Sequence, residues 1–298
     1  MEQITLRAYA KVNLTLDVVG RREDGYHLLE SVMQSISLAD TLTLRKKPGG
    51  ISLRCDHPLL PIDQDNICWR AAAAFGDHAR IPGGVSVEIT LVKAIPLAAG
   101  LGGGSADAAA VLYGLNRLYD AGLNLGQLQK IGLTIGADVP FCLQGGTCLV
   151  EGIGDRVMAV PAFPQAVLVL VKPEAGVSTA ETYGRLDPRA HGGTSTARLV
   201  SFLNENRPIP TLAEVLENAL ESATIPFVPE VGLWKERLLR AGAHGAMMSG
   251  SGPTVFGLFT DVEAAKSCRD RYREEAEVSM VGLMNKGLSI LNGGDNQL

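Results

Sequence analysis

The chain has 298 residues, of which 46% are hydrophobic and 20% are charged, and its formal net charge is −5. This size and composition are typical of a globular protein with room for two hydrophobic cores. The negative charge argues against nucleic acid as a partner, because binding to a phosphate backbone needs an excess of Lys and Arg. The sequence has no apolar run of about 18 residues, which argues against a transmembrane helix.

The first residues, MEQITLRAYAKVNLTL, alternate apolar and polar side chains at once and lack the apolar core of a signal peptide. We therefore expect a cytoplasmic protein with no membrane partner. The five cysteines are scattered and form no CxxC pair, which indicates reduced thiols within a packed protein. The sequence does not distinguish between a monomer and a homodimer.

The first half of the chain reads as strands interrupted by a helix. Apolar and polar residues alternate from Val12 to Val18, which predicts a half-buried strand. The segment Thr41–Cys55, with a Pro-Gly-Gly turn at its centre, predicts a β-hairpin. A helix capped by Asn66 is expected next, and the alternation from Val85 to Leu91 predicts a further strand.

The rest of the chain mixes helices and strands. Apolar residues at helical spacing follow the glycines at 100–104, and a short helix is expected from Asn124 to Gly136. Residues 165–171 are typical of a strand buried on both faces, and Ser178 followed by a glutamate three residues later predicts a capping box. The segment MMSGSGPTVFGLF indicates a glycine turn that enters a strand.

The proline-bearing segment VMAVPAFPQ is our predicted domain boundary. It separates residues 1–158, expected to form an N-terminal domain, from residues 159–298, expected to form a C-terminal domain. The overall fold class is predicted to be α+β.

Glycines are concentrated in the stretch IPLAAGLGGGSADAAAVL, directly before a predicted helix. The first turn of a helix has unpaired N–H groups and a positive dipole end, and glycine lets a ligand approach the backbone closely. Such a loop is a receptor for phosphate. The alternative is a simple tight turn, which needs only one or two glycines. Asp107 lies in the first helical turns, so its carboxylate must point away from a bound anion.

Three common nucleotide-binding patterns do not fit these glycines. A P-loop requires GxxxxGK[ST], but no Lys-Ser or Lys-Thr follows here. A dinucleotide fingerprint requires GxGxxG, but the sixth position counted from Gly100 is Ser105. The HRD and DFG motifs of protein kinases are also missing.

The motif PLAAGLGGGSADAAAVL resembles the phosphate-binding loop of the GHMP small-molecule kinases. Two further motifs of that superfamily occur in the expected order, AYAKVNLTLDVVGRREDGYH near the start and MMSGSGPTVFGLF near the end. The resemblance covers nearly the whole chain. It implies a two-domain α+β fold whose active site lies in the cleft between the domains, with ATP as co-substrate and Mg²⁺ as cofactor.

The combination of AKVNLTL, DGYHLLES, GLGGGSADAA, GADVPFCLQGG and SGSGPTVF is most similar to one branch of this superfamily. Members of that branch phosphorylate the 2-hydroxyl of 4-diphosphocytidyl-2-C-methyl-D-erythritol, in the non-mevalonate route to isoprenoids. Two other functions stay open, a sister kinase acting on homoserine or mevalonate and a nucleotide-binding sensor without catalysis. A dehydrogenase is a more distant alternative.

By resemblance, Lys11 and Asp138 are the catalytic pair. An ammonium beside a carboxylate keeps the carboxylate ionised, and Asp138 can then accept the proton of the attacking hydroxyl. The plain alternatives are a solvated strand lysine and a turn aspartate. ATP is expected to bind along one loop, formed by Pro96, Leu97, Ala98, Ala99, Gly100, Leu101, Gly102, Gly103, Gly104, Ser105 and Ala106. The protein ligands of Mg²⁺ are not evident.

Four residues are expected to bind the acceptor substrate. The resemblance assigns Tyr26 and His27 to the cytosine, through stacking and hydrogen bonding respectively, and Tyr183 to the opposite wall. Asn13 is expected to hold the methylerythritol hydroxyls. The sequence departs from the common pattern at Leu28 and at Ala106–Asp107. The segment SGSGPT has two open roles, contact with the ligands or support of the phosphate loop.

Overall fold

In this computed structural model, residues 1–23, 25, 27–186 and 192–291 are described. The elements of the first half are β1 (Gln3–Asn13), β2 (Thr15–Arg21), β3 (His27–Lys46), β4 (Ile51–Cys55), α1 (Ile67–Ala79), β5 (Val87–Val92), α2 (Gly103–Tyr119), α3 (Leu125–Leu133), α4 (Val139–Gln144), β6 (Thr147–Gly152) and β7 (Arg156–Ala159).

The second half adds six helices and six strands to the described part of the chain. They are β8 (Val167–Lys172), α5 (Thr179–Arg185), α6 (Ser195–Asn204), α7 (Ile209–Ala213), β9 (Glu217–Asn218), α8 (Glu221–Thr224), α9 (Glu230–Arg240), β10 (Gly245–Met248), β11 (Val255–Phe259), α10 (Val262–Tyr272), β12 (Glu277–Met284) and β13 (Leu288–Ile290). Among all the described residues, no helix is both long and apolar enough to cross a lipid bilayer.

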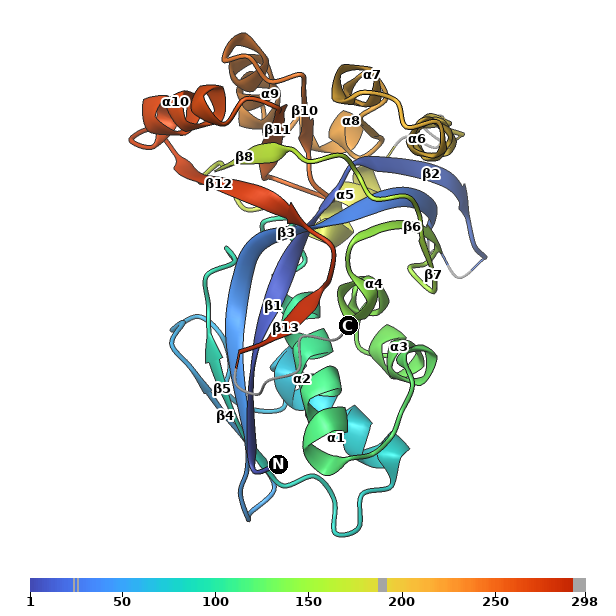
Figure 1. Cartoon of the computed structure of the whole chain (residues 1–298), viewed down its shortest axis with the longest axis vertical. Coiled ribbons are helices and arrows are strands. Elements are labelled where there is room, and N and C mark those ends of the chain that lie inside the picture. The colour runs from blue at the N-terminus through green and yellow to red at the C-terminus, as the bar shows by residue number, and fades with distance from the viewer. Residues whose placement is uncertain (24, 26, 187–191, 292–298) are drawn as a thin grey trace.

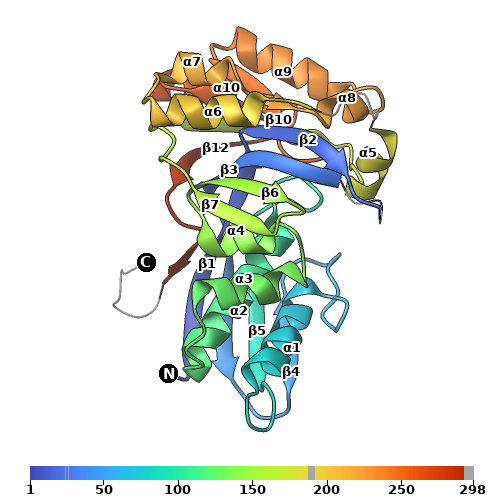
Figure 2. The same ribbon diagram turned by 90° about the vertical axis from the view of Figure 1, so that its right-hand side faces the viewer.

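The long strand β3 connects the two halves of the molecule (Figure 1). It pairs with β1 and β5 at its C-terminal end, with β2 and β6 at its N-terminal end, and with β12 between them. Figure 2 shows helices α6, α7, α9 and α10 above the upper strands and α1, α2 and α3 beside the lower ones. The strands β12 and β13 return from the second half to pair with β3 and β1.

Most predicted elements are confirmed. Helix α1 begins after Asn66, whose side chain accepts a hydrogen bond from the Cys68 amide at 2.8 Å. Helix α3 begins after Asn124, which forms a reciprocal capping box with Gln127. The four central residues of β8 are buried, and the expected glycine turn lies between β10 and the strand β11. Ser178 caps α5 from one side only, because no return bond from a glutamate side chain accompanies it. All five cysteines have free thiols. The boundary between residues 158 and 159 stays a prediction.

The predicted half-buried strand from Val12 to Val18 is wrong in two respects. The chain bends at Leu14, so the segment is the end of β1 and the start of β2. Its polar side chains are also buried, as is the neighbouring Lys11; they are Asn13, Thr15 and Asp17. Asp17 shows the cause, since its carboxylate accepts hydrogen bonds from the Ser195 hydroxyl and the Thr196 amide at the start of α6.

The predicted hairpin over Thr41–Cys55 is also wrong. The chain does reverse after β3, but β4 does not pair with β3. Strand β5 lies between them, antiparallel to β3 and parallel to β4. The buried apolar side chains of β5 make it the better central strand. The turn residues predict that the chain reverses, but they carry no information about a strand about forty residues later in the sequence. The pairing of β3 with β4 was therefore predicted wrongly.

Glu88 of β5 joins these three strands through its carboxylate. It accepts hydrogen bonds from Arg45 and Lys47 on the β3 side and lies 3.2 Å from Arg54 of β4. The hydrogen bonds from Lys47 and Arg45 lower the pKa of Glu88 to about 2.

Replacing this carboxylate should change how the stability of the protein depends on pH. A carboxyl group whose pKa is lower in the folded protein stabilises the fold at pH values above its pKa in the unfolded chain, which is about 4.3 for Glu. The wild type should therefore be more stable than Glu88→Gln at pH 7, and this advantage should shrink as the pH falls from about 5 towards 2. Urea unfolding at pH 7 and pH 3.5 measures the difference, with the exposed Glu236→Gln as control. A difference that does not depend on pH would contradict the assignment.

Candidate active site

The glycine-rich loop connects β5 to α2 and forms one wall of a cavity of about 610 Å³. Residues 96–105 all line this cavity. Gly100 and Gly102 have φ angles of +74° and +71°, which other residues rarely adopt. Gly102 is the N-cap of α2, so the first turn of this helix opens directly onto the cavity.

Ala106 departs from the predicted set. It is fully buried, does not line the cavity, and its amide bonds to the Gly102 carbonyl at 2.9 Å as part of the helix. The candidate phosphate loop therefore ends at Ser105.

Lys11 lies beneath the glycine loop because β1 loses its regular pairing with β3 at this point. The register shifts between Tyr9 and Lys11, and the Lys11 amide donates instead to the Leu101 carbonyl at 2.9 Å. A Cβ atom at Gly102 would lie 2.9 Å from Cγ of Lys11. The glycine therefore gives the lysine stem room to pass under the loop.

The Lys11 ammonium contacts Asn13 and also Asp138, its expected partner. Its Nζ atom donates to Oδ1 of Asn13 at 2.8 Å and lies 3.4 Å from Oδ2 of Asp138. The lysine side chain is 4% exposed and that of the aspartate 30%, so the carboxylate faces the open side. Asp138 is the N-cap of α4, where its side chain makes no capping bond.

A chain of hydrogen bonds fixes the orientation of Asn13. The Ser31 hydroxyl donates to the Thr15 carbonyl at 2.6 Å, so it accepts from Nδ2 of Asn13 at 2.8 Å. The amide oxygen of Asn13 must then face the Lys11 ammonium. Asn13 lines the cavity, and its hydrogen bond to Ser31 holds its side chain in place.

The loop at residues 249–252 supports the glycine loop, which is one of the two roles that the sequence left open, and contact with the ligands stays a prediction. It packs on the glycine loop, since the Ser249 hydroxyl donates to the Gly100 carbonyl at 2.9 Å. It also contributes Gly250, Ser251 and Gly252 to the cavity wall. A Cβ atom at Gly250 would lie 3.2 Å from the Lys11 ammonium.

The expected substrate-binding aromatic residues meet at the edge of the cavity. The rings of His27 and Tyr183 are stacked with centroids 5.3 Å apart and an angle of 28° between their planes. Tyr183 lines the cavity, whereas His27 contacts Tyr183 but is not part of the cavity wall. Burial, and the nearby Asp138, raise the pKa of the Tyr183 phenol, so this ring is neutral. Tyr26 lies outside the described residues.

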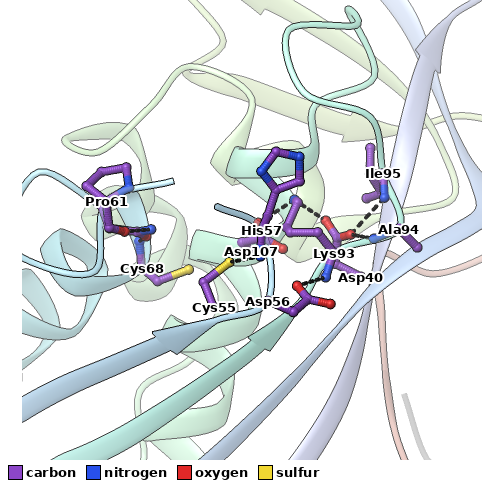
Figure 3. A network of polar contacts seen from close by, with 11 residues as sticks. Asp40, Cys55, Asp56, His57, Pro61, Cys68, Lys93, Ala94, Ile95 and Asp107 are labelled. Carbon is purple, nitrogen blue, oxygen red and sulfur yellow. Dashed lines mark hydrogen bonds and ion pairs between the residues drawn. The ribbon is translucent and has the colours of Figure 1, made fainter. Parts of the chain in front are cut away.

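Asp107 does not line the cavity in which a phosphate would bind. Its Oδ2 atom lies 2.8 Å from the ammonium of Lys93, which also contacts Asp40 (Figure 3). Burial raises the pKa of the Asp107 carboxyl well above its usual range, although Lys93 opposes this shift. The raised pKa and the Lys93 ammonium therefore both reduce the negative charge of Asp107 near the start of α2.

Sequence reasoning missed several residues that line the cavity. Lys93 is one of them, and its place three residues before Pro96, at the start of the glycine loop, was the signal that could have identified it. Thr179 was another, and its hydroxyl lies 2.9 Å from that of Ser251. The apolar part of the cavity wall could not be predicted from any short motif, because its residues come from segments that are distant in the sequence. These residues are Leu16, Leu29, Met33, Ile67 and Val177.

Gly100 offers a test of the contact between the two loops. A Cβ atom there would overlap the Ser249 carbonyl oxygen and lie 3.1 Å from the Gly252 amide. Gly100→Ala should therefore lower the free energy of unfolding by about 1–3 kcal/mol more than a matched control. Gly122→Ala is that control, since Gly122 has a similar φ of +66° and nothing within 4 Å of its Cβ position. Equal losses in urea unfolding would show that the two loops are not in close contact.

Comparisons with known proteins agree with this geometry. The family model "GHMP kinases N terminal domain" matches residues 66–146, and "GHMP kinases C terminal" matches residues 199–278. A curated 4-diphosphocytidyl-2-C-methyl-D-erythritol kinase of Clostridium novyi (strain NT) is 44% identical over 270 residues, which are 90% of this chain and 95% of the relative.

Two solved structures have the same fold. A crystal structure of 4-(cytidine 5'-diphospho)-2C-methyl-D-erythritol kinase has a TM-score of 0.78 and 34% identity, and the match covers 94% of this chain and 98% of that one. A homoserine kinase from Cytophaga hutchinsonii has a TM-score of 0.80, with 98% of each chain covered, but at 22% identity it supports the fold alone. The chain therefore belongs to the GHMP kinases and, within them, to the family of the 4-diphosphocytidyl-2-C-methyl-D-erythritol kinases.

Proposed function

We propose that this chain transfers the γ-phosphoryl group of ATP to the 2-hydroxyl of 4-diphosphocytidyl-2-C-methyl-D-erythritol, a step of the non-mevalonate route to isoprenoid precursors. The observation that carries the proposal is the position of Lys11 and Asp138 in the same cavity as the glycine loop. The names of the relatives support the acceptor. In this proposal residues 1–158 bind ATP, and residues 159–298 complete the substrate site.

Asp138 acts as the general base. Its carboxylate is the more exposed partner of the ion pair and makes no capping bond, so it is available to a hydroxyl group in the cavity. The hydroxyl oxygen forms a bond to the γ-phosphorus while the bond to the β,γ-bridging oxygen breaks, and ADP leaves with that electron pair. The hydroxyl proton moves to Asp138.

Lys11 and the glycine loop stabilise the charge that the transfer develops. The buried ammonium lies beneath the loop, within reach of both the carboxylate and the first turn of α2. The unpaired amides of that turn offer hydrogen bonds to phosphate oxygens, and the helix dipole favours negative charge there. Asn13 holds Lys11 from the other side and presents its fixed amide to the acceptor.

The donor set fits a magnesium ion carried by the triphosphate. Among the described residues no group of three or more His, Cys, Asp or Glu side chains could hold a metal on its own. Mg²⁺ in phosphoryl transfer needs only one or two protein oxygens, since phosphate oxygens and water complete its octahedron. The Ser105 hydroxyl, in the first turn of α2 at the cavity wall, would hold it. When bound, the ion neutralises charge on the β- and γ-phosphates.

Removing the base should reduce turnover. Asp138→Asn keeps the size of the side chain but cannot take a proton, so kcat should fall at least ~100-fold while both KM values change little. A coupled assay for ADP release, with the proposed alcohol and Mg²⁺ present, measures this. The exposed Asp120→Asn serves as a matched control. Near-normal turnover of Asp138→Asn would reject the role of the carboxylate.

The aromatic pair should decide the choice of acceptor. His27→Ala and Tyr183→Ala each remove one ring of the stack, so each should raise KM for the cytidyl alcohol about 10-fold, a loss of about 1.4 kcal/mol. KM for ATP should stay within about twofold. The exposed His78→Ala is the control. Unchanged saturation by the cytidyl alcohol, or faster turnover of homoserine or mevalonate by the wild type, would favour a sister kinase.

A further inference from the structure

A buried cluster of three ionisable side chains, Lys93, Asp40 and Asp107, lies beside the start of the glycine loop (Figure 3). The Lys93 ammonium contacts Oδ2 of Asp40 and lies 2.8 Å from Oδ2 of Asp107. The three side chains are 4%, 0% and 2% exposed in that order. Ionisable groups buried this deeply destabilise a protein unless each has a partner, and here the ammonium and the two carboxyl groups are partners of one another.

Asp40 does more than pair with the ammonium. Its Oδ1 atom accepts hydrogen bonds from the amides of Ala94 at 2.6 Å and Ile95 at 2.8 Å. These amides follow directly after β5, which ends at Val92, so Asp40 holds the chain where it leaves the sheet. Asp40 itself belongs to β3, opposite Ala8 of β1, and is therefore anchored in the middle of the sheet.

The other end of the glycine loop is tied to the same ammonium. Asp107 belongs to α2, the helix whose first turn faces the cavity. A Cβ atom at Gly103 would lie 3.4 Å from Nζ of Lys93 and 3.0 Å from the Ile95 side chain. The first residues of the loop, at Ile95, and its last residues, at Gly103, thus both lie close to Lys93. Asp40 holds Lys93 in place.

We propose that Asp40 is a positioning residue for phosphoryl transfer, which holds both ends of the glycine loop in their binding geometry before ATP arrives. This inference rests on the proposed kinase function. A loop that is ordered in advance loses less entropy when a ligand binds. Asp40 acts through the Ala94 and Ile95 amides and through Lys93, without touching the substrates.

The neighbouring aspartate provides a matched comparison. Asp40→Asn and Asp107→Asn each replace one carboxyl group that faces the same ammonium, but only Asp40 binds the loop amides. Asp40→Asn should raise KM for ATP about 10-fold and leave KM for the alcohol within about twofold, since hydrogen bonds to a charged group are the stronger ones. The increase for Asp107→Asn should be at least threefold smaller. Equal increases in both variants, or a parallel rise in both KM values, would overturn the proposal.

Amide hydrogen exchange of the wild-type protein tests the same claim without any variant, and therefore decides even if Asp40→Asn fails to fold. The Ala94 and Ile95 amides should exchange slowly in the nucleotide-free protein and change little when ADP and Mg²⁺ are added. Fast exchange that becomes slow only with nucleotide would overturn the proposal. Slow exchange in a chain that lacks kinase activity would reject the proposed function while leaving the ordered loop in place.

Discussion

The close approach of two backbone segments to Lys11 is the constraint on which the site depends. Gly102 passes over the stem of this lysine, and Gly250 passes beside its ammonium. Any side chain at either glycine would meet the lysine. The contact is possible because β1 loses its pairing with β3 just before Lys11, which frees the Lys11 amide to bind the glycine loop. Two halves of the chain thereby converge on one buried cation.

Charge is distributed around this contact so that an anion can enter. The protein as a whole is acidic, with a formal net charge of −5, yet each carboxylate close to the loop has a basic partner. Asp138 pairs with Lys11, and Asp40 and Asp107 share Lys93. The amides and the dipole of α2 then act on a phosphate without strong opposition. A local arrangement of dipoles and paired charges replaces the overall positive charge that binding to nucleic acid requires.

Much of this was predictable from the sequence because the signals are local. The helix start after Asn66, the glycine loop before α2 and the pair of Lys11 and Asp138 all follow from short patterns or from the family resemblance. The place of β5 between β3 and β4 was not predictable, because strand order depends on packing between distant segments. The burial of Asp17 and the role of Lys93 were missed for the same reason, since their partners Ser195 and Asp107 come from other elements.

A crystal structure with a non-hydrolysable ATP analogue, Mg²⁺ and the acceptor alcohol tests the central claim most directly. The γ-phosphate should lie at the amides of the first turn of α2, within hydrogen-bonding distance of the Lys11 ammonium, with the 2-hydroxyl between it and Asp138. A triphosphate bound away from the glycine loop, with Lys11 and Asp138 remote from its terminal phosphorus, would contradict the account.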